Sequence, residues 1–437
     1  MSSIMEIERF RQLKSSVRNR SKFLLVGVDV SKKFSVCCFG SMEKGVFLSK
    51  YRVSHNEEGL QRLNDTIKAL KEKHELQDIV IGVEPTGNYH KAFCEYLRKQ
   101  GHFIVYVSSV AAKNNRTTLF GGRWGKNDPR DAFNVFDLLK QGKTLYYRQE
   151  GTESSDVRRY LNIRQKLMKR KSAIKNSIRT QILACHFPEL EEIYKEMSDP
   201  EFTHFLENCT TADYVKNLDL AVFLRIFSAF RWSEKRVERL TVVWQLARKS
   251  IGYPGQASVT FEAKLLVREL IRIQQDVADI DKKLEEFCNK SGVYKKLLGI
   301  PGFGPFIVSV FIAILGDINS FRHWKQIVKF AGLDIETAES GKFRGKAKIS
   351  KKGNALLRYA VSTAVNIAVS RNEQVKRLFE EKLRQKGDTK ENRAKLKIKF
   401  AEKFIQIAFI LLTQNKAFDL NYLNVPVREP VLNNVGA

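Results

Sequence analysis

The amino-acid sequence predicts an α/β N-terminal domain over residues 1–150, a helical coiled-coil region over 151–292 and a mostly α-helical C-terminal domain over 293–437. The first region alternates short apolar runs with helical periodicity, the second shows helical periodicity only, and the third turns glycine-rich and then strongly basic. Hydrophobic residues make up 43% of the 437 residues. This content excludes a disordered chain, and a single core stops growing at roughly 250–300 residues, so we expect several folded domains.

The first domain is expected to hold a mixed sheet. Its apolar runs predict five strands, and the periodic stretches between them predict two helices. In chain order these elements are strands Phe23–Val30, Phe34–Phe39 and Val46–Val53, helix Asn56–Lys73, strand Asp78–Val83, helix Tyr89–Arg98 and strand Phe103–Val107. Three strands followed by alternating helix and strand are typical of an α/β domain that starts with a meander.

An apolar seam runs along the second part of the middle region. Its residues are spaced alternately four and three apart over three heptads: Leu266, Leu270, Ile273, Val277, Ile280, Leu284 and Phe287. This spacing is typical of a coiled coil. The partner is expected to be the earlier helix Asp156–Leu183, in which Tyr160, Ile163, Leu167 and Ile174 follow a similar, interrupted rhythm.

That earlier helix is strongly basic. It carries Arg158, Arg159, Arg164, Lys166, Lys169, Arg170, Lys171, Lys175 and Arg179 against one acid, Asp156. A solvated helix face is the simplest interpretation, but so many like charges repel one another unless an anion is near. We therefore favour a helix that contacts phosphates.

The C-terminal domain opens with a predicted helix-hairpin-helix over Leu297–Gly316, in which Gly302 and Gly304 let the backbone approach a phosphate closely. A helical hairpin without any ligand is the equal alternative. The stretch that follows holds six candidate phosphate contacts: Lys342, Arg344, Lys346, Lys348, Lys351 and Lys352. A basic helical tail then ends in an apolar helix near Ala401–Leu412.

The chain has 76 basic and 48 acidic residues, a formal charge of +28, which indicates a polyanionic partner. Because the basic residues are dispersed over several long segments, nucleic acid is favoured over a membrane surface. The six cysteines show no zinc-ligand spacing, and we expect reduced core residues. With no apolar leader and no span of about 20 apolar residues, the expected location is cytoplasmic, on the nucleoid when DNA is bound.

Four carboxylates form the first candidate for chemistry. Asp29 ends the first strand, Glu84 follows the fourth, and Asp128 and Asp131 lie three residues apart at a helix start, where Asp128 is the expected N-cap. Convergent carboxylates of this kind hold divalent cations for phosphoryl transfer. Taken singly, each residue has a simpler role as turn former, ion-pair partner or helix cap. Their conjunction in one basic protein favours the metal site.

A serine within the cationic stretch is the second candidate. Ser340 lies beside Gly341 among lysines and arginines that would stabilise charge as its hydroxyl attacks a phosphodiester, and Ser350 is its rival. The sequence has no phosphate-binding G-x-x-x-x-G-K-[ST] loop, which argues against a nucleoside triphosphatase.

Together these motifs resemble the insertion-sequence 110 family of transposases. The resemblance rests on G-V-D-V-S-K, V-E-P-T-G-N-Y and K-N-D-P-R-D-A for the DEDD tetrad, and on L-L-G-I-P-G-F-G-P, F-A-G-L, E-S-G-K and I-S-K-K-G-N-A-L-L-R for the C-terminal domain. The motifs occur in the family's order. Two departures are Asn127, where the family often has Thr, and a single serine before Gly341, where Ser-Ser-Gly-Gly is common.

The resemblance implies a RuvC-like N-terminal domain of ribonuclease-H type, with Mg²⁺ held by Asp29, Glu84, Asp128 and Asp131. It implies that Ser340 attacks DNA to form a transient phosphoserine link, each site being completed by two subunits of a homodimer or homotetramer. It also implies a structured bridge RNA that pairs with target and donor DNA. The alternatives are a RuvC-like, metal-dependent, structure-specific endonuclease and a non-catalytic RNA- or DNA-binding protein.

Overall fold

The computed structural model describes residues 8–12, 22–85, 87–120, 127–146, 152–255, 257–290, 292–336, 339–340, 343–344 and 348–424. The chain divides into two compact units, Met1–Glu150 and Gly151–Ala437. The first unit has the bounds of the predicted α/β domain. The boundary predicted at residues 292 and 293 falls inside the second unit, and the three-domain division stays a prediction.

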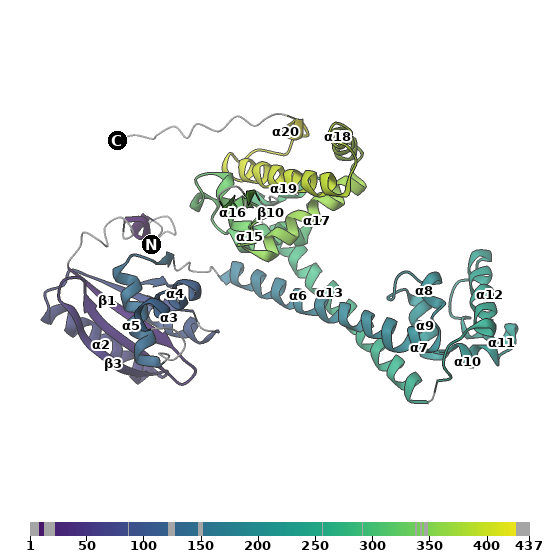
Figure 1. Cartoon of the computed structure of the whole chain (residues 1–437), viewed down its shortest axis with the longest axis horizontal. Helices are drawn as coiled ribbons and strands as arrows, with labels where there is room; N and C mark the ends of the chain where they lie inside the picture. Colours follow the sequence, from purple (N-terminus) through teal and green to yellow (C-terminus); the bar gives the residue numbers. More distant parts are fainter. Residues whose placement is uncertain are drawn as a thin grey trace. The chain divides into compact units, whose positions relative to one another are not determined.

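The first unit is built on a mixed sheet, as predicted (Figure 1). Among the described residues the strands are ordered β3-β2-β1-β4-β5-β6. Their bounds are β1 Phe23–Val30, β2 Phe34–Ser41, β3 Gly45–Ser54, β4 Asp78–Glu84, β5 Phe103–Tyr106 and β6 Leu145–Tyr146. The first three strands pair antiparallel, β1, β4 and β5 pair parallel, and β6 returns antiparallel to β5. The short strand β6 was not predicted.

Helices cover both faces of this sheet. Their bounds are α2 Glu57–Lys73, α3 Tyr89–Lys99, α4 Ser109–Phe120 and α5 Asp128–Lys140. Because side chains alternate along a strand, Leu24 and Val26 of β1 pack into the core shared with α2 and α3, whereas Leu25 packs with Phe136 of α5 on the other face. Helix α4, also absent from the prediction, lies against α5.

The second unit is helical apart from four two-residue strands in its described residues. Its first part comprises α6 Thr152–Ser177, the π-helical segment η2 Ile178–Leu183, α7 Ala184–His186, α8 Leu190–Ile193, α9 Pro200–Asn208, α10 Ala212–Lys216, α11 Leu220–Ile226, α12 Glu234–Lys249 and α13 Ala257–Lys290. The remainder comprises α14 Gly292–Lys295, the 3₁₀ turns η3 Leu297–Gly299 and η4 Ile318–Ser320, α15 Pro305–Leu315, α16 Trp324–Ala331, α17 Ala355–Arg371, α18 Glu373–Arg384, α19 Lys390–Thr413 and α20 Asn421–Asn424.

Two hydrophobic cores organise this unit, and α6 and α13 contribute to both. The lobe core is formed by buried residues between Ile174 and Ile273, and the C-terminal core by residues from Val157 to Leu423. Helices α6 and α13 lie side by side within one chain (Figure 1). They run antiparallel, because Arg164 pairs with Asp281 while Arg170, further along α6, pairs with the earlier Glu269.

The predicted seam on α13 is divided between these cores. Leu270 and Ile273 are buried in the lobe core, whereas Ile280 and Leu284 are buried in the C-terminal core. Three seam residues are only partly buried: Leu266, Val277 and Phe287. The expected partner helix, α6, does lie beside α13, but the seam itself packs into two cores that other helices also build, and a coiled coil stays a prediction.

The predictions about cysteines and membranes meet two further findings. All six cysteines are free; five are buried and Cys185 is exposed. Burial raises the pKa of the Cys38 thiol to about 11, as expected of an unreactive core residue. In the described part of the chain, no helix is long and apolar enough to cross a membrane.

Candidate active site

Asp29 and Glu84 meet at one edge of the sheet. They are register partners in the parallel pair of β1 and β4, so their backbones are about 4.8 Å apart. Both side chains are half-buried. Each lies two residues beyond a glycine, Gly27 or Gly82, that faces α5, so strand alternation points both carboxylates to the α5 face.

Helix α5 packs closely on that face because β1 has a glycine, Gly27, at the point of contact. A Cβ atom built on Gly27 would lie 2.3 Å from the backbone nitrogen of Phe136 and 2.5 Å from the carbonyl oxygen of Ala132. The glycine therefore allows helix and strand backbones to touch. Asp131 precedes Ala132, so the first turn of α5 is held near the end of β1 that bears Asp29.

The start of α5 differs by one residue from the prediction. Asn127, not Asp128, is the N-cap: its backbone is extended and its side-chain oxygen accepts a hydrogen bond from the Arg130 backbone nitrogen at 3.0 Å. Asp128 is already helical and is exposed, whereas Asp131 is 5% exposed. The two aspartates therefore occupy different environments one turn apart.

Asp131 is paired with a residue that the sequence analysis missed. Its Oδ1 atom accepts a hydrogen bond of 2.6 Å from Nε of Arg116 on α4. The guanidinium is itself largely buried, with 17% of its side chain exposed. No local sequence pattern reveals this pair, because α4 and α5 meet only in the folded domain.

The oxygen donors fit a divalent cation in part. Across the described residues no group of three or more acidic, histidine or cysteine side chains is close enough to hold a metal ion. The neighbouring pair Asp29 and Glu84 nevertheless suits Mg²⁺, which is commonly bound by one or two carboxylates and completes its shell with water and substrate phosphates. The four-carboxylate metal site stays a prediction.

Ser340 is placed by its backbone on a short β-arm. The arm consists of β7 Ile335–Glu336 paired with β10 Lys348–Ile349, and of β8 Glu339–Ser340 paired with β9 Phe343–Arg344. Ser340 is the register partner of Phe343, so it lies at the end of the β8–β9 pair that is farther from β7 and β10 along the chain. Lys342 and Lys346 lie outside the described residues, while Lys348, Lys351 and Lys352 are exposed.

The base of this arm is formed by two of the motifs singled out above. Gly332 in F-A-G-L and Gly353 in S-K-K-G-N lie back to back, since a Cβ atom on Gly353 would be 2.5 Å from the Gly332 nitrogen. The Asn354 nitrogen donates to the Phe330 carbonyl at 2.7 Å, and Arg358 donates through Nη1 to the Ala331 carbonyl at 2.8 Å. These contacts fix the end of α16 to the start of α17.

The rival serine belongs to that base. The Ser350 hydroxyl donates to Oδ1 of Asp334 at 2.5 Å and accepts from the Lys352 backbone nitrogen at 3.3 Å. Its backbone nitrogen also donates to the Asp334 carbonyl at 2.8 Å. Ser350 therefore closes a turn beside β10, and Ser340 is the serine on the arm itself.

The basic helix α6 uses part of its charge internally. Arg164 pairs with Asp281 at 2.6 Å and stacks on Phe306, with 18% of its side chain exposed. Arg158 donates to the Ala313 carbonyl, Arg170 pairs with Glu269, and Lys171 is half-buried, with a pKa lowered chiefly by desolvation. Three of the predicted phosphate contacts are exposed on α6 without such a role: Arg159, Lys166 and Lys169.

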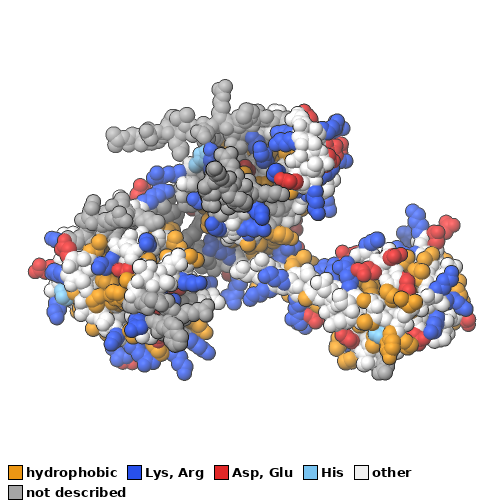
Figure 2. Space-filling model, viewed as in Figure 1, with side chains coloured by type: hydrophobic (Ala, Val, Ile, Leu, Met, Phe, Trp, Pro, Cys, Tyr) orange, Lys and Arg blue, Asp and Glu red, His pale blue; other side chains and the backbone are white. Residues whose placement is uncertain are grey.

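Figure 2 shows lysine and arginine side chains dispersed over the viewed face, with acidic groups between them.

The predicted helix-hairpin-helix is incomplete. A single 3₁₀ turn, η3, precedes the Pro-Gly turn where an apolar α-helix was expected, and only its second helix, α15, has the predicted form. Gly302 has a positive φ of 82°, and a Cβ atom there would lie 2.1 Å from the Ala364 carbonyl oxygen of α17. This glycine therefore serves close helix packing, whereas Gly304 has open space around its Cα.

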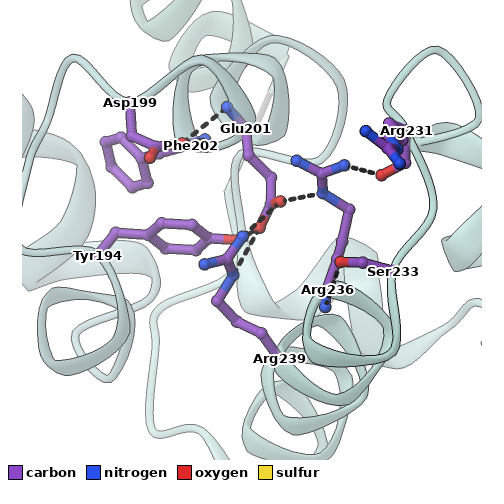
Figure 3. A network of polar contacts seen from close by, with 8 residues as sticks. All are labelled: Tyr194, Asp199, Glu201, Phe202, Arg231, Ser233, Arg236 and Arg239. Carbon is purple, nitrogen blue, oxygen red and sulfur yellow. Dashed lines mark hydrogen bonds and ion pairs between the residues drawn. The ribbon is translucent and has the colours of Figure 1, made fainter.

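A buried carboxylate organises the lobe (Figure 3). Glu201, with 2% of its side chain exposed, accepts hydrogen bonds from Arg236 at 2.7 Å, from Arg239 at 2.6 and 2.8 Å, and from the Tyr194 hydroxyl at 2.7 Å. Burial alone raises the pKa of Glu201, but these hydrogen bonds outweigh it and lower the pKa. The network holds α9 to α12 and was not predicted.

Comparison with known proteins identifies two matching regions. Residues 26–188 match the transposase family of DEDD type named for IS110, and residues 294–380 match the transposase IS116/IS110/IS902 family. The first match includes all four carboxylates and the second includes Ser340. Both agree with the resemblance noted from the motifs.

Three similar proteins come from insertion elements. The chain is 23% identical over 233 residues to a transposase for insertion sequence element IS1111A of Coxiella burnetii, covering 53% of this chain and 52% of that protein. It is 20% identical to an uncharacterized 44.8 kDa protein of element IS116 of Streptomyces clavuligerus, covering 71% and 78% of the two chains. It is 22% identical to an uncharacterized 42 kDa protein of element IS900 of Mycobacterium paratuberculosis, covering 83% and 89%. The chain thus spans about half the length of the Coxiella relative.

Proposed function

This chain belongs to the insertion-sequence 110 family of transposases, and from that premise we propose that it excises and inserts its own mobile element. It would cut and rejoin DNA strands through a covalent link at Ser340, assisted by the carboxylates Asp29, Glu84, Asp128 and Asp131. A structured bridge RNA would choose the sites by pairing with both target and donor DNA.

The observation that carries this proposal is the register pairing of Asp29 with Glu84 on the face covered by α5. Adjacent strand ends place two oxygen donors side by side, and in the proposed site the first turn of α5 would contribute Asp128 and Asp131. A divalent cation bound there would stabilise charge on the attacking and leaving oxygens of a phosphodiester. The family match supports dependence on such a metal, and Mg²⁺ is our choice among the hard cations.

The proposed reaction conserves the number of phosphodiester bonds. The Ser340 oxygen bonds to phosphorus as one phosphorus–sugar oxygen bond breaks, and the serine proton is lost while the departing sugar oxygen gains one. A sugar hydroxyl of the partner strand then attacks the phosphoserine and releases the serine. Because the bond energy is retained in the covalent link, strands are rejoined without an external energy source.

The cationic arm would provide the electrostatic part of this step. Arg344 is the register partner of Glu339 on the neighbouring strand, and Lys348 is exposed on the outer pair. Cationic groups near the attacked phosphate stabilise the charge that develops in the transition state. The fixed contacts at the base of the arm would hold Ser340 in a defined position while DNA is bound.

The carboxylates and Ser340 lie in different units, so one subunit does not need to supply both. We propose an active homodimer or homotetramer in which each site combines groups from two subunits. Mixing Asp29→Asn protein with Ser340→Ala protein tests this directly. The mixture should regain part of the strand-exchange activity that each variant lacks alone, and a mixture as inactive as its components would contradict shared sites.

Guidance by RNA rests on the net charge of +28 and on the exposed basic residues of α6. Base pairing would supply sequence choice while the protein contacts backbone phosphates. Sequencing the RNA that co-purifies with the protein is the test. One structured species from the element supports guidance, whereas a random mixture supports generic binding.

A metal-only endonuclease is the second candidate, because Asp29 and Glu84 are adjacent within the first unit and require nothing from Ser340. Two variants separate these functions in a DNA cleavage assay. The recombinase loses cleavage in both Asp29→Asn and Ser340→Ala. The endonuclease loses it in Asp29→Asn and keeps it in Ser340→Ala.

A further inference from the structure

A polar interface joins α4 to α5 beside the candidate metal site. The Asn115 amide donates to Asn134 and to Asp137, each at 2.9 Å, and its oxygen accepts from Gln141 at 3.0 Å. Asn134 is fully buried and donates to the Ala112 carbonyl at 2.8 Å. Helix α4 is therefore fixed to α5 by directional hydrogen bonds, in addition to the apolar contact of Ala112 with Val135 and Leu138.

Arg116 differs from the other members of this interface because its partner is a candidate metal ligand. Asp131 is 5% exposed, and a carboxylate this deeply buried requires a compensating charge. Among the described residues Arg116 supplies it through Nε, at 2.6 Å from Oδ1. This contact holds the Oδ1 atom of the carboxylate in place.

We propose that Arg116 is a positioning residue of the carboxylate site, which holds Asp131 by one oxygen so that the other is presented to the divalent cation. This inference rests on the proposed function, since it takes the four carboxylates as the metal site. Arg116 itself would not touch the metal or the DNA.

Two physical effects of Arg116 oppose each other. Its positive charge repels a nearby divalent cation, whereas its hydrogen bond holds the Asp131 carboxylate in place before the cation arrives. Groups that orient metal ligands typically change metal affinity by about 10- to 100-fold when they are removed. We assign the larger effect to orientation, because without Arg116 the buried carboxylate loses the hydrogen bond that holds it in position.

The test measures Mn²⁺ binding to the full-length protein, freed of RNA by nuclease and high salt, by electron paramagnetic resonance titration of free Mn²⁺. Arg116→Met should weaken Mn²⁺ binding at the Asp29-dependent site by about 10- to 100-fold. Arg116→Lys, which keeps the charge and a donor, should regain part of the affinity. If Arg116→Met does not fold, Arg116→Gln, which keeps an N–H donor without charge, provides the same comparison.

Asn115→Ala is the matched control, since it breaks the same interface one residue away without touching Asp131. It should lower stability and leave Mn²⁺ affinity within about twofold of the wild type. An equal loss of affinity in Asn115→Ala would mean that helix packing, not Arg116, governs the site. Unchanged or tighter Mn²⁺ binding in Arg116→Met would also overturn the proposal.

The outcome for Asp29→Asn distinguishes a failure of this inference from a failure of the proposed function on which it rests. If the wild type shows no Mn²⁺ binding that Asp29→Asn removes, the carboxylate metal site fails, and the role of Arg116 fails with it. If that binding is present but its affinity does not change when Arg116 is replaced, only the proposed role of Arg116 fails.

Discussion

Replacing Gly27 by alanine should separate α5 from the sheet and disturb the carboxylate site. The added Cβ atom would lie 2.3 Å from the Phe136 nitrogen and 2.7 Å from its Cα atom, and both are backbone atoms that no rotamer change can move. Restoring an ordinary contact of about 3.4 Å requires the helix to shift by roughly 1 Å. The helix carries Asp128 and Asp131, so both aspartates should move with it.

The magnitude follows from this clash. Forcing a methyl group into a packed core costs about 1–3 kcal/mol. This cost corresponds to a roughly 5- to 150-fold increase in the equilibrium constant for local opening, which hydrogen exchange measures. A displacement of about 1 Å at a catalytic centre lowers activity by about 100-fold. Gly27→Ala should therefore weaken both the fold of the first unit and DNA cleavage.

Gly82→Ala is the matched control, because Gly82 is the register partner of Gly27 on β4. Its Cβ atom would meet only side-chain atoms of Leu139, Cδ2 at 2.6 Å and Cγ at 2.8 Å, and no backbone atom. A side chain can adjust more easily than a helix backbone, so we expect a smaller cost than for Gly27→Ala and cleavage closer to the wild type.

Hydrogen–deuterium exchange of the full-length protein, read on peptides covering β1 and α5, measures the first effect, and a DNA cleavage assay measures the second. Gly27→Ala should exchange faster in both peptides, and by more than Gly82→Ala does. Wild-type exchange and cleavage in Gly27→Ala would refute the close packing of α5 on β1 and, with it, our placement of the aspartates.

Three further predictions concern the second unit. Glu201→Gln should destabilise the lobe by about 3 kcal/mol in thermal or urea unfolding, because the buried carboxylate that pairs with Arg236 and Arg239 loses its charge. Since the folded-state pKa of Glu201 is lowered, its contribution is present above about pH 4.3 and is lost as pH falls through the folded value, so the two proteins should converge in stability at acidic pH. Gly302→Ala should destabilise the C-terminal core by several kcal/mol, because the added Cβ atom would meet the α17 backbone at a position with a left-handed backbone conformation. If the substitution changed only DNA affinity, the result would support the predicted phosphate contact of Gly302 instead. Replacing Arg159, Lys166 and Lys169 together by glutamine should reduce the salt slope of duplex DNA binding by about 2–3 units, and an unchanged slope would exclude this face of α6 from phosphate contact.

Local patterns in the sequence were sufficient to predict much of the first unit. Apolar runs placed β1 at Phe23–Val30 without error and β2 and β3 within two residues at each end, because β1 and β2 are buried and all three strands are bounded by turn residues. The run of motifs also placed Asp29 and Glu84 at strand ends, where parallel pairing brings them together. Helix α4 was missed because it packs through alanines and polar side chains, which leaves no stripe of large apolar residues to reveal a helix.

The contacts that the sequence could not reveal join residues far apart in the chain. Arg116 meets Asp131, Glu201 meets arginines 35 and 38 residues later, and Arg164 meets Asp281. Periodicity identifies an apolar face but not what covers it, which is why the seam of α13 was read as one interface instead of parts of two cores. The strands of the β-arm are two residues long and too short to leave a periodic signal.

Covalent trapping tests the central claim, that Ser340 is the nucleophile, most directly. A suicide DNA substrate, which loses its departing strand after cleavage, is incubated with the protein, and the attached peptide is identified by mass spectrometry after proteolysis. We predict DNA attached to a peptide containing Ser340, no adduct in Ser340→Ala despite retained RNA and DNA binding, and an adduct in Ser350→Ala. An adduct that persists in Ser340→Ala and disappears in Ser350→Ala would contradict the assignment, as would cleavage that requires Asp29 but neither serine.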